Sequence, residues 1–191
     1  VACLVGSEMC IRDRFYNPNF LSKKEIEDIS YEDLSDKKWL NSIAVRQSNN
    51  IYNQSLVASM LEHNGVNNTK KWLEGLVNNF ARSPQGNDRA QILMVASGEA
   101  KLAIANSYYY ALMLSGKKGI EQKKAAKKVI PIFPNQLDRG THINISGAGI
   151  IKFSKNKKNA EKFLEFLLTN DSQSEFCSNS FEYPVIAVSY T

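Results

Sequence analysis

The sequence has few of the residues that build disulfide frameworks and most metal clusters. Its 191 residues include three cysteines and two histidines, and Cys177 is the only cysteine beyond residue 14. A single thiol forms neither an internal disulfide nor a metal cluster. His63 and His142 do not fit the HxxxH or HExxH spacings of helical metal sites, and we expect both to be surface or supporting residues. No apolar run approaches the ~20 residues of a membrane-spanning helix, so we expect a protein that does not itself span a membrane.

Both ends of the chain resemble sequence that is not native. Residues 3–14, CLVGSEMCIRDR, resemble the translation of a transposase sequencing adapter over their whole length. The reverse complement of one set of codons for MCIRDR reads Val-Ser-Tyr-Thr, which is the sequence of residues 188–191. We therefore interpret 1–14 and 188–191 as adapter artefact and leave them out of the fold expectations. The remainder, 15–187, is then expected to be an internal fragment whose signal peptide lies outside it.

The net charge of +5 is concentrated in two groups of lysines. One group spans 117–128 and holds six lysines, and the other spans 152–162 and holds five. Such groups are compatible with a nucleic-acid surface or with solvated helix faces. Both groups lack the arginine that base readout favours. We therefore expect solvated faces and no nucleic-acid partner.

Apolar patterning predicts strands that alternate with helices. The stretch LAIAN at 102–106 has the near-continuous apolar character of a strand buried on both faces. Gly65 and Gly98 follow apolar residues at helical spacing and are expected to end helices. Strands are expected at 42–47, 102–106, 129–134, 141–146 and 149–154, and helices at 53–65, 67–81, 89–98, 108–116 and 157–170, with a short last helix through Phe176. This alternation indicates an α/β fold with mainly parallel sheets.

Three consecutive tyrosines directly follow the strand at 102–106 and open the next helix. In open α/β sheets, ligands bind beyond the carboxyl ends of strands, and a helix start favours negative charge. A bound cation can displace a phenolic proton. Adjacent helical residues point ~100° apart, so Tyr108 and Tyr109 could meet one ion only at an irregular helix start, while Tyr110 would turn to the core. Packing with hydroxyls at the rim remains the alternative.

Five motifs of the sequence resemble one known family in their order and spacing. They are SNNIYNQSLVASM, GLVNNFARSPQGND, GEAKLAIANSYYY, FPNQLDRGTHINISGAG and FEYPV. Together they are similar to the ferric-iron-binding periplasmic proteins of ABC transporters, in the branch found in cyanobacteria and marine bacteria. The resemblance runs over nearly all of 15–187. It implies a two-lobed periplasmic binding protein fold of type II, transferrin-lobe-like and incomplete here, with Fe(III) held between the lobes by tyrosine phenolates.

The same resemblance implies which residues hold the metal. Tyr108 and Tyr109 correspond to the paired tyrosine ligands, and Tyr52, before NQS, corresponds to a further one. Ser48 and Asn106 correspond to positions that contact a bound anion, such as carbonate, in some relatives. Further ligands would come from a first-lobe segment that this chain lacks.

The resemblance also implies the organisation and role of the protein. Residues 15–138 would be mostly the second lobe, and 139–187 a partial return to the first. The complete protein would be a periplasmic, monomeric carrier that delivers Fe(III) to an inner-membrane ABC permease. We expect no enzyme, because no nucleophile–base pair or carboxylate dyad stands out. The alternatives are a protein of the same fold that binds a phosphate-like anion or thiamine, and a basic nucleic-acid-binding module.

Overall fold

The computed structural model describes residues 9–145 and 147–187, which fall into two compact units. The larger unit is Ile11–His142, and the described residues on either side of it form the smaller one. This division lies close to the predicted boundary between 138 and 139. The assignment of the two parts to the lobes of a complete protein stays a prediction.

The larger unit is built on a mixed sheet with the strand order β2-β3-β1-β4. Strand β2 runs parallel to β3, whereas β1 is antiparallel to both β3 and β4. The expectation of mainly parallel pairing is therefore wrong for this sheet, because β1 was left out of the expected strands. In chain order the elements are β1 (Met9–Tyr16), the 3-10 helices η1 (Lys23–Glu25), η2 (Glu32–Ser35) and η3 (Lys37–Trp39), then β2 (Ile43–Ala44), α1 (Ile51–Asn78), α2 (Asp88–Ser97), β3 (Leu102–Asn106), α3 (Ser107–Leu114), α4 (Ile120–Ala126) and β4 (Ile130–Ile132).

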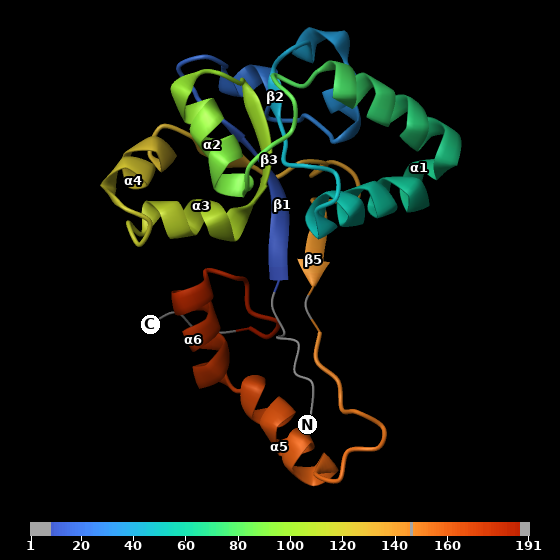
Figure 1. Cartoon of the computed structure of the whole chain (residues 1–191), viewed down its shortest axis with the longest axis vertical. Helices are drawn as coiled ribbons and strands as arrows, with labels where there is room; N and C mark the ends of the chain where they lie inside the picture. The colour runs from blue at the N-terminus through green and yellow to red at the C-terminus, as the bar shows by residue number, and fades with distance from the viewer. Residues whose placement is uncertain (1–8, 146, 188–191) are drawn as a thin grey trace. The chain divides into compact units, whose positions relative to one another are not determined.

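Helices cover both faces of this sheet (Figure 1), with α1 on one side and α2, α3 and α4 on the other. Successive residues of a strand point to opposite faces. Accordingly, Leu102 and Ile104 of β3 belong to the apolar cluster under α1, and Ala103 and Ala105 belong to the cluster under α2. All five residues of β3 are buried, which confirms the prediction for LAIAN.

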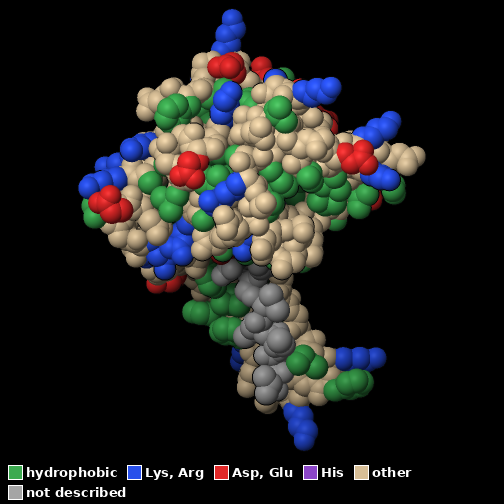
Figure 2. Space-filling view, turned by 45° about the horizontal axis from the view of Figure 1, so that its top comes forward, with side chains coloured by type: hydrophobic (Ala, Val, Ile, Leu, Met, Phe, Trp, Pro, Cys, Tyr) green, Lys and Arg blue, Asp and Glu red, His purple; other side chains and the backbone are tan. Residues whose placement is uncertain are grey.

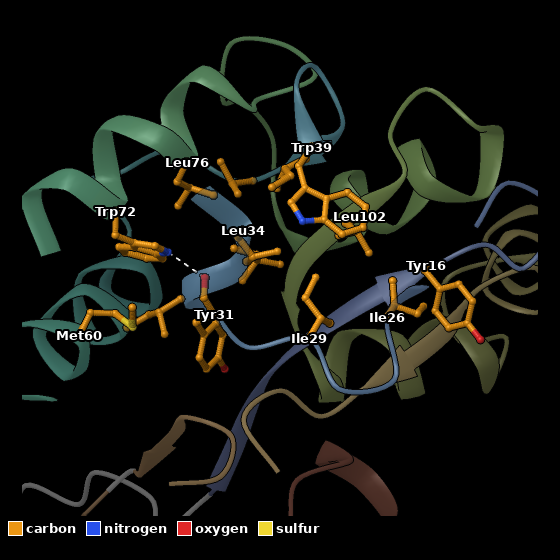
Figure 3. Packing of buried hydrophobic residues seen from close by; sticks show 14 of the residues in the cluster. Tyr16, Ile26, Ile29, Tyr31, Leu34, Trp39, Met60, Trp72, Leu76 and Leu102 are labelled. Carbon is orange, nitrogen blue, oxygen red and sulfur yellow. Dashed lines mark hydrogen bonds between the residues drawn. The ribbon is translucent and has the colours of Figure 1, made fainter. Parts of the chain in front are cut away.

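The core on the α1 side joins the second half of α1 to the 3-10 helices (Figure 3). Trp72 lies among the apolar side chains, and its indole Nε1 donates a hydrogen bond to the carbonyl oxygen of Tyr31 at 2.7 Å. Leu34 of η2 is fully buried in the same cluster. The long segment between β1 and β2, for which no strand or helix was predicted, is therefore part of the core.

Helix α1 is interrupted at Gly65, where the backbone has φ 72° and ψ 168°. This conformation is available to glycine and strained for other residues, so the predicted end of a helix at Gly65 is confirmed. The Thr69 hydroxyl donates to the carbonyl oxygen of Met60 across the interruption, at 2.9 Å. Gly98 ends α2 in the left-handed region, as predicted.

Strand β1 carries three consecutive charged residues into the interior. Arg12, Asp13 and Arg14 are each at most 1% exposed. Arg12 pairs with Asp88, and Arg14 donates to backbone carbonyls at 29–30. Within the described structure, neither carboxylate oxygen of Asp13 has a hydrogen-bond partner of ordinary geometry. The interpretation of 1–14 as adapter-derived stays a prediction, but residues 11–14 form part of the central sheet of this chain.

The smaller unit contains β5 (Ile143–Ile145), α5 (Lys157–Leu167) and α6 (Asn170–Ser180). The strand predicted at 149–154 is wrong, because these residues form no strand and Phe153 is 85% exposed. An extended segment is stable as a strand only when its backbone groups find partners. Helix α6 also runs past the predicted end at Phe176. None of the helices in the described parts of the chain is long and apolar enough to cross a membrane.

Candidate metal centre

Two helix starts of the larger unit have a cap asparagine with the same extended backbone conformation. Asn50 precedes α1 with φ −80° and ψ 135°, and Asn106 precedes α3 with φ −81° and ψ 138°. In each case a tyrosine is the second helical residue, Tyr52 in α1 and Tyr108 in α3. The Asn50 side chain accepts a hydrogen bond from the backbone N–H of Tyr52 at 3.0 Å. The motif Asn-x-Tyr therefore occurs at both helix starts, with the asparagine as an extended cap residue and the tyrosine in the first turn.

The two junctions bring the predicted tyrosines together. The hydroxyl oxygens of Tyr52 and Tyr108 lie 3.3 Å apart, although the residues are 56 positions apart in sequence. The rings of Tyr108 and Tyr109 lie 4.1 Å apart between centroids at an interplanar angle of 32°, and their hydroxyls also interact. All three side chains are half-buried. The larger unit thus presents three phenolic oxygens in one cluster.

Tyr110 leaves this cluster, as the helical geometry predicted. Its hydroxyl donates to the carbonyl oxygen of Val129 at 3.0 Å, and its ring packs against Phe15 with centroids 5.2 Å apart. It belongs to the apolar cluster under α2. The predicted core role of Tyr110 is therefore confirmed, and Tyr110 provides a matched control for its two neighbours.

The surroundings of Tyr108 favour its neutral phenol form. Burial raises the pKa of Tyr108 above its ordinary value, and the neighbouring hydroxyls of Tyr109 and Tyr52 raise it further. A trivalent cation reverses this balance because it stabilises phenolate directly. In an octahedral site with bonds of about 2 Å, neighbouring oxygens lie about 2.8 Å apart. Tyr52 and Tyr108 therefore need only a small side-chain movement to share one ion.

An arginine that the sequence reasoning did not assign to the site lies beside the tyrosines. The Arg46 side chain forms hydrogen bonds with Asp88 and with Tyr109. Its guanidinium carbon lies 5.8 Å from the centroid of the Tyr52 ring. Burial lowers the pKa of Arg46, but the Asp88 carboxylate and Tyr109 raise it more, so the net shift is upward. The available signal was an arginine directly after the apolar stretch at 43–45 and six residues before Tyr52, a predicted ligand.

The two predicted anion contacts lie in different surroundings. Asn106 is fully buried, and its side-chain oxygen accepts from Arg12 at 3.1 Å. The Nδ2 atom of Asn106 has no hydrogen-bond partner within the described structure. Ser48 is exposed and lines a cavity of about 810 Å³ whose walls are mostly apolar. Tyr52, Tyr108 and Tyr109 are not among the residues that line this cavity. Asn106 is the cap residue of α3, which carries Tyr108 and Tyr109, and Ser48 lies two residues before Asn50, the cap residue of α1.

Other side chains that commonly bind metals do not gather in the described residues. Within 9–145 and 147–187, no group of three or more His, Cys, Asp or Glu side chains is arranged to hold a metal ion. His63 is exposed, and the Nε2 atom of His142 lies 2.9 Å from the Ser55 hydroxyl. Phenolic oxygens are therefore the candidate metal donors of this chain.

Comparison with known proteins identifies the family. The family model for bacterial extracellular solute-binding proteins matches residues 15–190. The chain belongs to this family. The match begins at residue 15, directly after the adapter-like segment 1–14, and it extends to residue 190, into the segment 188–191 that was also interpreted as adapter. The bacterial extracellular solute-binding proteins are a transport family rather than a family of enzymes.

Relatives within the bacterial extracellular solute-binding proteins are named for iron. Iron uptake protein A1 of Synechocystis sp. is 46% identical over 172 residues, which are 90% of this chain and 47% of the relative. The major ferric iron-binding protein of Neisseria meningitidis is 28% identical over 170 residues, covering 89% of this chain and 49% of the relative. The chain spans about half the length of the curated relatives that it matches.

Solved structures confirm the fold class. Trichodesmium FutA (IdiA), in complex with iron and citrate ligands, matches with a TM-score of 0.90 and 46% identity, over 95% of this chain and 57% of that chain. Apo FutA2 from Synechocystis matches with a TM-score of 0.89 and 40% identity, over 96% of this chain and 59% of that chain. The chain therefore has the α/β fold of the two-lobed periplasmic iron-binding proteins and contains part of it.

Proposed function

We propose that Tyr52, Tyr108 and Tyr109 bind Fe(III) through their phenolate oxygens, and that the complete protein carries this iron to an ABC permease for uptake. The observation that carries the proposal is the 3.3 Å separation of the Tyr52 and Tyr108 hydroxyl oxygens, which come from two different helix starts. The iron is the cargo of the protein. The names of the relatives, which refer to iron uptake and ferric iron binding, support the same ligand.

The chemistry of the cluster suits a hard trivalent cation. Phenolates are anionic oxygen donors, and hard cations prefer oxygen ligands. Three phenolates carry three negative charges, which balance the charge of one Fe(III) ion. Both Tyr52 and Tyr108 lie in the first turn of a helix, where the helix dipole also favours negative charge. The cluster can therefore hold the ion without an acidic side chain.

Three phenolic oxygens do not fill the coordination sphere of an octahedral ion. We propose that the remaining positions are filled from the part of the longer protein that this chain does not contain, with or without an anion such as carbonate near Asn106. Closure of two lobes around the ion would then exclude water from the site. Periplasmic location, a monomeric state and delivery to an inner-membrane permease are parts of the same proposal, in keeping with a family that works with ABC permeases.

Iron titration of the 191-residue chain tests the ligands directly. Fe(III) supplied as its nitrilotriacetate complex should produce a visible phenolate-to-iron charge-transfer band. Substituting phenylalanine for Tyr52, Tyr108 or Tyr109 should weaken or remove the band, whereas Tyr110→Phe should leave it unchanged. A chain that stays colourless and retains no iron would overturn the proposal and favour an anion-binding or thiamine-binding relative of the same fold.

The nucleic-acid alternative has less support from the surface. The two lysine groups, 117–128 and 152–162, belong to different units. Basic and acidic side chains are mixed over the face of the molecule seen in Figure 2. Lys124 also pairs with Glu121 at 3.0 Å. Duplex or single-stranded DNA should therefore not compete with iron, which a filter-binding assay at low salt can measure.

A further inference from the structure

Asp88 occupies a buried position between the two tyrosine-bearing junctions. It is the first residue of α2 and is fully buried. Its Oδ1 atom accepts hydrogen bonds from the backbone N–H of Asn106 at 3.0 Å and from the guanidinium of Arg12 at 2.5 Å. Its Oδ2 atom accepts a hydrogen bond from Arg46. The two oxygens of one carboxylate therefore bind different parts of the fold.

One oxygen of Asp88 holds the junction that carries Tyr108. Asn106 is the last residue of β3 and the cap residue of α3, and Tyr108 follows it by two positions. A hydrogen bond to the Asn106 N–H therefore fixes the backbone at the point where the strand becomes the helix. Because an ionised carboxylate makes stronger hydrogen bonds than a neutral acceptor, this contact limits the movement of the start of α3.

The other oxygen of Asp88 holds the junction that carries Tyr52. Arg46 lies in the segment between β2 and α1. The Asn53 side chain donates to the backbone carbonyl of Arg46 at 2.8 Å and to that of Gln47 at 3.1 Å. Asn53 is the neighbour of Tyr52 in α1. Asp88 thus reaches the start of α1 through Arg46 and Asn53.

We propose that Asp88 is a positioning residue for the tyrosine cluster, and that it acts on Tyr109 and Tyr52 through Arg46. The carboxylate sets the separation of the two helix starts and directs the Arg46 guanidinium to the Tyr109 hydroxyl. Arginine is suited to this contact because its charge is permanent and its planar group binds two partners in fixed directions. The expected effect of Asp88 on iron binding rests on the proposed function. Its expected effect on the positions of the tyrosines does not require iron.

A second carboxylate–arginine network provides a matched control. Glu32 in η2 accepts hydrogen bonds from Arg139, Asn64 and Asn135. Like Asp88 it joins distant segments of the larger unit, but its partners lie outside the tyrosine junctions. Glu32→Gln should therefore reduce stability while it leaves the tyrosine cluster in place.

The test compares the 191-residue chain with Asp88→Asn, Arg46→Gln and Glu32→Gln. Without metal, photosensitised oxidation should form a dityrosine link between Tyr52 and Tyr108, and mass spectrometry of the linked peptides measures its yield. With Fe(III), the charge-transfer band per bound iron and the affinity in competition with nitrilotriacetate are measured. Residues that orient metal ligands typically change affinity by ~10- to 100-fold.

We expect Asp88→Asn and Arg46→Gln to lower the link yield, shift the band and weaken iron binding ~10- to 100-fold. The double variant should lose no more than the worse single variant, because both residues act through one contact. Glu32→Gln should retain the yield, the band and the affinity. The more exposed Arg46 provides a variant that can be measured if Asp88→Asn does not fold.

The outcomes separate this inference from the proposed function. If Arg46→Gln and any folded Asp88→Asn keep the wild-type link yield and iron affinity, Asp88 is only a structural residue and the inference is wrong. If the wild-type chain forms the Tyr52–Tyr108 link but gives no iron band, the proposed function fails. In that case, a lower link yield in the variants still supports the positioning role.

Discussion

Removing the charge of Asp13 should stabilise the chain strongly at neutral pH. Burial raises the pKa of this carboxyl from 3.8 to about 8, although the Ser107 hydroxyl, Arg12 and Arg14 lower it in part. A carboxyl whose pKa is raised on folding favours the folded state below its unfolded pKa, and this stability is lost as pH rises toward the folded pKa. Between pH 4 and pH 7 the loss amounts to about 4 kcal/mol. Asp13→Asn, which is uncharged and of similar shape, should not suffer this loss.

The measurement is equilibrium unfolding in urea, followed by circular dichroism between pH 4 and pH 8. Asp13→Asn and the wild-type chain should have similar free energies of unfolding near pH 4, and the variant should be more stable by about 4 kcal/mol at pH 7. Asp36, whose side chain is 53% exposed, provides the control, because Asp36→Asn should change stability by less than about 0.5 kcal/mol at either pH. A difference between Asp13→Asn and wild type that does not vary with pH would refute the reasoning.

Three further predictions concern stability at other positions. Burial raises the pKa of Glu32, but hydrogen bonds from Asn135, Asn64 and Arg139 lower it more, to about 2. The resulting stability is present above pH 4.5 and is lost as pH falls toward 2. Because the Glu32 side chain is 35% exposed, solvent screens the interaction, and Glu32→Gln should cost about 1–2 kcal/mol of unfolding free energy at pH 7. Equilibrium unfolding at pH 7 and pH 2.5 should show that the difference between Glu32→Gln and wild type is smaller at pH 2.5. Gly65→Ala should cost about 1–3 kcal/mol through backbone strain alone, since nothing lies within 4 Å of the added Cβ. Gly75→Ala should cost a similar amount for a different reason, because its Cβ would lie 2.7 Å from Ser35. Adding Ser35→Gly should restore part of the stability that Gly75→Ala loses. The same second substitution should restore none of the stability that Gly65→Ala loses.

The local parts of the fold could be predicted from sequence because local chemistry decides them. Glycine at 65 and 98 permits backbone conformations that end helices, and the apolar stretch at 102–106 requires burial on both faces. The tyrosines could be placed at helix starts for the same reason. The prediction that they bind a metal came from the family resemblance, since spacing alone favoured packing.

The remaining parts depend on contacts that local patterns do not contain. Strand β1 was missed because its three charged residues, 12–14, do not have the alternation of a buried strand, and because the segment was interpreted as adapter. The segment 149–154 has the composition of a strand but no strand partner among the described residues. The link between Arg46 and Asp88 joins positions 42 residues apart, and periodicity gives no signal for such a pair.

The paired Asn-x-Tyr junctions explain how the proposed metal site could be assembled before a metal binds. Each junction fixes the direction of a helix start through an extended asparagine, and the sheet fixes the distance between the two junctions. The Tyr52 and Tyr108 hydroxyl oxygens already lie 3.3 Å apart, so little conformational entropy would remain to be lost when an ion arrives at the proposed site. The free energy of binding is then opposed mainly by removal of the phenolic protons, which a trivalent cation offsets far better than a monovalent or divalent one. Selectivity of the proposed site for a highly charged, oxygen-seeking ion would therefore follow from its use of phenols, rather than carboxylates, as donors.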